Sequence, residues 1–201
     1  GKSSDLGAVL VTAIRRDASG TLWIGTDGHG LKWLRDGHFG SLGARSGMTD
    51  KFVLALLEDL EGSLWVGTNT GGLNRFRDGI FTTFSMEEGL VDDEIYALYE
   101  DVDGEVWVGS YRGLSRFHEG KIENFSVEDG LTDNFVTSFY RQDDGPLWIG
   151  TRGEVVLYED GRFRPLPART ESTPKGVRAI ISDARGAVWM GTTDDGVMIH
   201  S

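Results

Sequence analysis

The chain has 201 residues, with 20 Lys or Arg against 32 Asp or Glu, so its formal net charge at pH 7 is −12. This excess of acid repels phosphate backbones and anionic lipid, which makes nucleic acid a poor candidate partner. The absence of cysteine excludes disulfides and thiolate metal sites, and apolar runs such as residues 53–57 are far too short to span a bilayer, so we expect no direct membrane insertion of this segment.

From the N-terminus, the first expected element is a strand at Val11–Arg16, and a turn then leads into a second strand around Trp23. This tryptophan returns four more times, at intervals of 42, 42, 41 and 41 residues, always with a glycine two residues later and another three residues before it. An acid stands six residues before each tryptophan except in the fourth copy, which has Gln142. The repeated pairs are Trp23 and Gly25, Trp65 and Gly67, Trp107 and Gly109, Trp148 and Gly150, and Trp189 and Gly191.

Each repeat is expected to form four short strands. After the tryptophan strand comes a third strand, such as Leu73–Arg77, and then a pair such as Asp78-Gly79 that suits the positive φ angles of a tight hairpin before the fourth strand. Four antiparallel strands at this period describe one blade of a β-propeller. We therefore predict an all-β fold, one propeller domain over residues 1–201 with five blades. The repeat units are 11–52, 53–94, 95–135, 136–176 and the incomplete 177–201.

The repeated residues are interpreted as structural. A tryptophan can fill the wedge between neighbouring blades, and the glycine two residues later leaves space for close approach. The repeated acid can shape the turn by hydrogen bonds to the backbone. A ligand site rarely needs five equivalent copies of one residue, so the site is sought where the repeats differ.

The phrase D-x-x-G-x-L-W-I-G-T, followed by G-L and an aromatic residue, resembles the two-component regulator propeller repeat. Residues 59–68 with Gly72, Leu73 and Phe76 show the full pattern. The resemblance implies an extracytoplasmic sensor region of a histidine kinase, hence a periplasmic or extracellular, non-catalytic domain for ligand sensing or protein interaction. In many members of this family two propellers precede a smaller β-domain, a membrane helix and the kinase.

The fifth repeat reaches only its third strand, at residues 197–201, and the residues before Val11 do not resemble a fourth strand. The last blade is thus predicted to be one strand short, with an exposed edge. Three arrangements remain open: a five-bladed ring that closes without this strand, a piece of a larger propeller, or completion by a second copy. We expect self-association through the open ends.

Candidate ligand-binding residues lie in the loops from the second to the third strand and from the fourth strand to the next blade, which share one face of a propeller. Polar, charged and aromatic groups that converge there suit a carbohydrate or another small polar ligand. The alternative is that they are solvated loop tips. The candidates are Lys51, Asp93, Tyr111, Arg112, Asn134, Arg152 and Lys175.

No catalytic residue, metal site or cofactor is predicted. The histidines, residues 29, 38, 118 and 200, have no metal-ligand spacing, and acidic pairs such as Asp92-Asp93 and Asp143-Asp144 fall in predicted turns. A propeller lyase or hydrolase is the alternative function, but it would need a cluster of histidine and acid on one face, where His29 is the only histidine expected. A scaffold or fragment without retained activity is the third possibility.

Overall fold

The structure is a computed structural model that describes residues 7–118, 120–142, 144–167 and 173–200. Its strands are grouped in five antiparallel sheets. The first sheet contains β1 (Val11–Arg16), β2 (Leu22–Thr26), β3 (Leu31–Arg35) and β4 (His38–Leu42). The second contains β5 (Val53–Glu58), β6 (Leu64–Thr68), β7 (Leu73–Arg77) and β8 (Ile80–Phe84). The third contains β9 (Ile95–Glu100), β10 (Val106–Ser110), β11 (Leu114–His118) and β12 (Lys121–Phe125).

The remaining two sheets continue the same order. The fourth contains β13 (Val136–Arg141), β14 (Leu147–Thr151), β15 (Val156–Glu159) and β16 (Arg162–Pro165). The fifth has only three strands, β17 (Val177–Ser182), β18 (Val188–Thr192) and β19 (Val197–His200). Two short 3-10 helices, η1 (Ala44–Ser46) and η2 (Val127–Asp129), lie in loops between blades.

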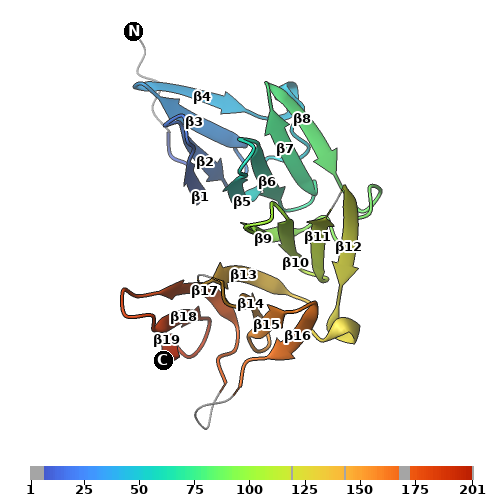
Figure 1. The fold of residues 1–201 in the computed structure, drawn as a ribbon. Coiled ribbons are helices and arrows are strands. Elements are labelled where there is room, and N and C mark those ends of the chain that lie inside the picture. Colours follow the sequence, from blue (N-terminus) through green and yellow to red (C-terminus); the bar gives the residue numbers. More distant parts are fainter. Residues whose placement is uncertain (1–6, 119, 143, 168–172, 201) are drawn as a thin grey trace.

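The five sheets are the blades of a β-propeller (Figure 1). Within each blade the strands follow chain order and pair with their sequence neighbours, as antiparallel hairpins require. The first strand of each blade packs against the first strand of the next, from β1 through β5, β9 and β13 to β17, so these strands lie nearest the centre. The prediction of an all-β propeller with a three-stranded last blade is therefore confirmed.

The tight turn before the fourth strand depends on an acid followed by glycine. Asp36, Asp78 and Asp160 have φ angles of 48°, 52° and 51°, and the glycine after each is also at positive φ. These are the angles that the hairpin needs at both central residues. In the third blade Gly120 has a φ of 75°, whereas its partner Glu119 lies outside the described residues.

A close contact between glycine and an aliphatic side chain joins neighbouring blades. A Cβ atom added at Gly67 would lie 2.7 Å from Ile95 Cγ2 of the next blade, and one at Gly109 would lie 2.7 Å from Val136 Cγ1. Because real Cβ atoms do not approach this closely, only glycine admits the contact. Trp65 and Trp107 are buried nearby, within apolar clusters that fill the seams between blades.

The acid six residues before the tryptophan holds both the turn and the indole. Asp59 accepts hydrogen bonds from the Ser63 backbone N–H (2.7 Å) and from Trp65 Nε1 (2.7 Å). In the third blade Arg141, which comes from the next blade, instead donates from Nη1 to both carboxylate oxygens of Asp101 at 2.8 Å. The buried Nε1 of Trp107 then has no hydrogen-bond partner among the described residues.

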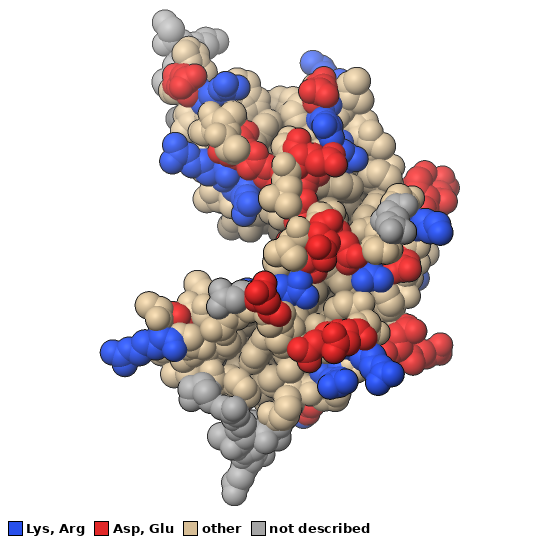
Figure 2. All heavy atoms as spheres, viewed as in Figure 1, with Lys and Arg blue, Asp and Glu red and all other residues tan. Residues whose placement is uncertain are grey.

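The ring of blades is open between the first and the fifth. Four apolar clusters fill the four seams between consecutive blades, but no comparable packing joins β17 to β1 in the described part of the chain. Figure 2 shows a deep opening between these two blades. The side chain of Ile14 on β1 is exposed there, and so is that of Ile181 on β17. The sequence allowed three arrangements. The first of them, a ring of five blades that closes on itself, is not the arrangement observed.

Candidate functional site

A polar cavity of about 370 Å³ lies where the loops of the third and fourth blades meet. Tyr111 and Arg112 come from the β10–β11 loop and Arg152 from the β14–β15 loop, while the segment from β12 to β13 closes the remaining side. The cavity thus collects side chains from three loops that are about 20 to 40 residues apart in sequence. Its lining is Tyr111, Arg112, Val127, Thr132, Asp133, Asn134 and Arg152.

Arg152 is held by Asp133. Its Nε lies 3.2 Å from Asp133 Oδ2, and this hydrogen bond and ion pair raise the pKa of the guanidinium above its ordinary value. The other carboxylate oxygen of Asp133 accepts from the Phe135 backbone N–H at 2.8 Å, which fixes the carboxylate against the start of β13. Arg152 itself is exposed, so its remaining N–H groups can reach a ligand.

Arg112 has a similar acidic neighbour. Its Nε lies 3.6 Å from Oδ1 of Asp92, whose side chain is buried. The second oxygen of this carboxylate, Oδ2, is buried with no hydrogen-bond partner among the described residues. A buried carboxylate oxygen favours a donor beside it, and Arg112, whose side chain is otherwise exposed, supplies a cation next to this carboxylate at the edge of the cavity.

An aromatic group borders the cavity. The ring of Tyr111 lies 5.2 Å from that of Phe135, which lies 4.6 Å from the ring of Tyr96. The guanidinium of Arg178, on β17, lies over the Phe135 ring, 5.4 Å from its centroid. Tyr96 donates its hydroxyl to Glu94 at 2.5 Å, and burial together with this bond raises the pKa of Tyr96 to about 12. Tyr111 is 46% exposed, so one side of its ring remains available.

Four of the seven residues predicted from the sequence line this cavity: Tyr111, Arg112, Asn134 and Arg152. The other three do not. Lys51 has its ammonium 5.5 Å from the ring of Phe52, at the seam between the first and second blades. Lys175 forms an isolated β-bridge with Glu154.

The third residue outside the cavity, Asp93, supports the loop that leads into its blade. Asp93 Oδ1 accepts from the Met86 backbone N–H at 2.8 Å, and Asn134 Oδ1 accepts from the Val127 N–H at 2.9 Å in the equivalent loop of the next blade. Each side chain therefore fixes the loop that leads into its blade. Asn134 also lines the cavity, whereas Asp93 does not.

Sequence reasoning missed Asp133 and Thr132, although the repeat contains a signal for the acid. Asp50, Asp92 and Asp133 occupy one repeat position, at intervals of 42 and 41 residues. Each contacts the loop after the tryptophan strand of its own blade: Asp50 Oδ2, for example, accepts from the Thr70 N–H at 2.9 Å. The repeats differ in the residue that this acid contacts, and of the three acids only Asp92 and Asp133 face an arginine.

The arrangement offers two guanidinium groups, an amide, a carboxylate and an exposed aromatic ring. Such a set can hydrogen-bond hydroxyl or carboxylate oxygens of a ligand and stack on its flat face. Among the described residues, no group of three His, Cys, Asp or Glu side chains could hold a metal ion. No helix in the described ranges is long and apolar enough to cross a bilayer.

Comparison with known families matches this chain in three places. The model of the two component regulator propeller matches residues 5–28, 89–112 and 130–153, each of which contains one of the repeated tryptophans. Three of the five repeats thus match the two-component regulator propeller family. Two of the three matched segments carry residues of the cavity, namely Tyr111 with Arg112, and Asn134 with Arg152.

Solved structures share the fold of this propeller. An extracellular domain assigned to a one-component system of B. thetaiotaomicron matches 98% of the chain at 20% identity, with a TM-score of 0.77. One assigned to a hybrid two-component system of the same bacterium matches 98% at 21% identity, with a TM-score of 0.73. The propeller spans 30% and 28% of those chains.

A propeller of known enzymatic class is similar as well. Virginiamycin B lyase from Staphylococcus aureus matches 95% of this chain and 69% of its own, at 18% identity and a TM-score of 0.69. At such identities the likeness shows the fold alone. No curated protein sequence matches the chain.

Proposed function

We propose that this propeller is the ligand-sensing part of a two-component regulatory protein, located in the periplasm or outside the cell. The cavity of Tyr111, Arg112, Asn134 and Arg152 would bind a small polar ligand, with a carbohydrate as the leading class. The observation that carries the proposal is the convergence of these side chains from separate loops of a two-component regulator propeller. The repeat gives every blade such loops, but a Tyr-Arg pair stands in the loop between the second and third strands only in the third blade.

The chemistry of the cavity suits a sugar. The exposed face of Tyr111 can stack on the apolar face of a pyranose ring, while Arg152 and the amide of Asn134 can donate to its hydroxyl oxygens. Asp133 keeps Arg152 oriented before a ligand arrives, which lowers the entropy lost on binding. A ligand that bridges Arg112 and Arg152 would link the third and fourth blades, and this would give a sensor a means of changing blade packing.

The test is calorimetric titration with a panel of oligosaccharides, uronic-acid sugars included. We expect a ligand whose affinity falls about tenfold or more in Tyr111→Ala. Phe52→Ala is the matched control, because Phe52 is a partly exposed aromatic residue at the seam of the first and second blades and should leave the affinity unchanged. Equal binding by Tyr111→Ala and wild type would place the site elsewhere. Failure of every polar ligand would favour a scaffold without ligand.

A lyase or hydrolase activity has weaker support. It is favoured only by the shared fold with virginiamycin B lyase. His29 lies in the exposed β2–β3 loop, with Nδ1 3.1 Å from the Asp27 carbonyl oxygen, whereas His38, His118 and His200 lie on strands β4, β11 and β19. Incubation with quinupristin followed by mass spectrometry tests this alternative, and product formation that is lost in His29→Ala would establish it.

A further inference from the structure

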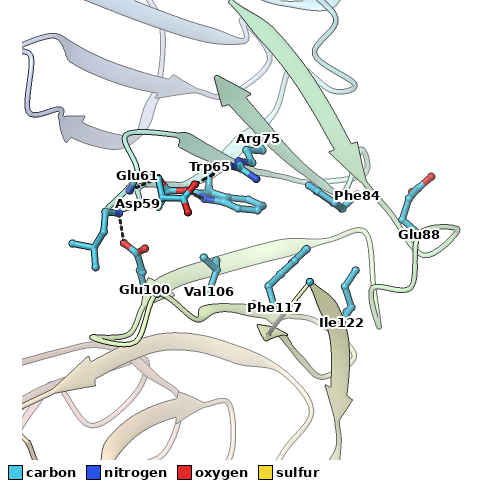
Figure 3. A pocket seen from close by; sticks show the side chains of 13 residues that line it. Asp59, Glu61, Trp65, Arg75, Phe84, Glu88, Glu100, Val106, Phe117 and Ile122 are labelled. Atoms are coloured by element: carbon cyan, nitrogen blue, oxygen red, sulfur yellow. Dashed lines mark hydrogen bonds and ion pairs between the residues drawn. The ribbon is translucent and has the colours of Figure 1, made fainter. Parts of the chain in front are cut away.

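A second cavity, of about 560 Å³, lies in the seam between the second and third blades. Trp65 and Phe84 reach into it from the second blade, and Phe117 and Ile122 face them from the third (Figure 3). It shares no lining residue with the candidate site described above. We call it the seam groove; its lining is Asp59, Leu60, Glu61, Trp65, Arg75, Phe84, Glu88, Glu100, Gly104, Val106, Phe117, Gly120 and Ile122.

The next seam, between the third and fourth blades, shows what such a space can hold. There the guanidinium of Arg116 lies among three aromatic rings, 5.0 Å from the centroid of Trp107, 5.6 Å from Phe125 and 5.8 Å from Tyr158. Its Nη1 donates to the Tyr158 hydroxyl at 3.0 Å and to Glu105 at 3.3 Å. The protein therefore places one of its own cations between the aromatic side chains of this seam.

The repeat aligns the two seams residue by residue. Trp65, Arg75 and Phe84 stand where the next seam has Trp107, Arg116 and Phe125, while Phe117 and Ile122 stand where it has Tyr158 and Phe163. These last two replacements matter, because Phe117 lacks the hydroxyl that binds the guanidinium and Ile122 is smaller than phenylalanine.

Arg75 does not fill the groove in the way that Arg116 fills the next seam. It lies over Trp65 at 5.4 Å, but its Nε donates to Ser63 Oγ at 3.0 Å and its Nη2 contacts Glu61 at 3.4 Å. Both partners belong to the same blade as Arg75, and among the described residues no hydrogen bond joins its guanidinium to the facing blade. Phe84 and Phe117 instead contact each other, with ring centroids 5.0 Å apart, and both pack against Trp65, so the three rings form one aromatic wall of the groove (Figure 3).

Acidic groups surround one end of the seam groove. Asp59, Glu61 and Glu100 gather where the turn of the second blade meets β9, and Glu100 accepts from the Leu60 N–H at 2.7 Å (Figure 3). Burial and the neighbouring charges of Asp59 and Glu61 raise the pKa of Glu100. Glu61 is already paired with Arg75 at 3.4 Å and with Arg77 at 2.6 Å, so Glu100 is the carboxylate that a ligand cation would stabilise.

We infer that the seam groove binds a small organic cation, a guanidinium, amidinium or ammonium group joined to an aromatic or alkyl body. The body would lie against the wall that Trp65, Phe84 and Phe117 form, and the cation would face Glu100. Aromatic walls, a negative end and a volume within the usual range for ligand cavities agree with this class. In the next seam, Arg116 already shows a guanidinium held by an aromatic ring and a carboxylate of this protein.

Benzamidine is the probe, titrated calorimetrically, with benzoate and benzyl alcohol as ligands of the same shape and different charge. We expect benzamidine alone to bind, with affinity at least fivefold weaker in Glu100→Gln, where the amide oxygen can still accept from Leu60. Ile122→Phe reproduces the residue of the next seam and should abolish binding by filling the groove. Circular dichroism verifies that both variants remain folded.

Two variants separate this inference from the proposed function. Tyr111→Ala should weaken the binding of the sugar and leave the binding of benzamidine unchanged. Ile122→Phe should abolish the binding of benzamidine and leave that of the sugar unchanged. The inference is overturned if benzoate binds as tightly as benzamidine, if wild type fails to bind the probe at millimolar concentration, or if folded Glu100→Gln and Ile122→Phe bind it as tightly as wild type.

Discussion

Val11 and Gly191 are the two halves of a contact that every other pair of neighbouring blades makes. In the repeat, Val11 corresponds to Val53, which is fully buried and would lie 2.6 Å from a Cβ at Gly25 of the preceding blade. Val11 is 39% exposed, and a Cβ at Gly191 would meet only Ala179 Cβ of its own blade, at 3.9 Å. Both residues are thus shaped for a neighbouring blade that the open ring does not supply.

This difference predicts opposite results for one substitution made in two repeats. Gly67→Ala should destabilise the protein by about 1–3 kcal/mol, because the new methyl group would lie 2.7 Å from Ile95 Cγ2. Gly191→Ala, the matched control, adds a methyl group in open space and should change the free energy of unfolding by less than about 0.5 kcal/mol. Urea denaturation measures both. Equal losses would mean that the glycine serves its own strand rather than the seam.

Substitution of a repeated tryptophan should likewise cost more at a packed seam than at the open one. Trp107 is fully buried, so Trp107→Ala should cost about 3–5 kcal/mol. Trp189 is 38% exposed, and no described blade packs beyond the fifth, so Trp189→Ala should cost less than half as much. Thermal and urea unfolding of the two variants test the comparison, and a Trp107→Ala loss below about 1 kcal/mol would contradict the packing described here.

The strands were predictable because their causes are local. The tryptophan phrase, the alternating apolar run before it and the acid-glycine turn together predict strands such as Val53–Glu58 and Leu64–Thr68 at the bounds observed. Closure of the ring was not predictable in this way. It depends on the angle between blades, which large side chains such as Trp65 and Phe117 determine across a seam, and no residue of a single repeat encodes it.

Part of the candidate site could also be predicted from local features of the sequence. Tyr111 and Arg152 stood out because their repeat position varies from blade to blade. Asp133 was missed because its acid recurs in three repeats, and its significance comes from the arginine that it meets. Tyr96 lies on a regular strand, where only the three-dimensional contact with Phe135 connects it to the cavity.

Tyr96 should contribute to a decrease in the free energy of unfolding at alkaline pH. Its pKa is raised from the ordinary value of 10.0 to about 12, so its contribution to stability is complete below pH 10. Between pH 10 and about 12 the unfolded state loses the phenolic proton while the folded state retains it, and stability therefore falls as the pH rises. Tyr96→Phe should make this decline shallower in urea denaturation, and should remove the tyrosinate absorbance that appears near pH 12. An unchanged decline would show that other groups cause it.

The open ends carry the last prediction, which is self-association. We propose that exposed apolar side chains on the first and fifth blades, such as Ile14 and Ile181, meet between chains, where Val11 of one copy can pack against Gly191 of another. The strand β19 also presents an edge without a neighbour among the described residues, and Val197 and Ile199 place no charge on it. Light scattering over a concentration series should give a mass that rises above the 22.1 kDa of one chain.

Two exposed isoleucines provide a matched test of that interface. Ile14→Lys places a charge on the open seam and should return the mass to that of a single chain, whereas Ile80→Lys changes an isoleucine of similar exposure on β8, at the outer edge of the second blade, and should not. The contact is head-to-tail, so association can continue beyond two copies unless the chains close on themselves. A wild-type mass that stays at 22.1 kDa at high concentration, or one that Ile14→Lys and Ile80→Lys reduce equally, would reject association through these ends.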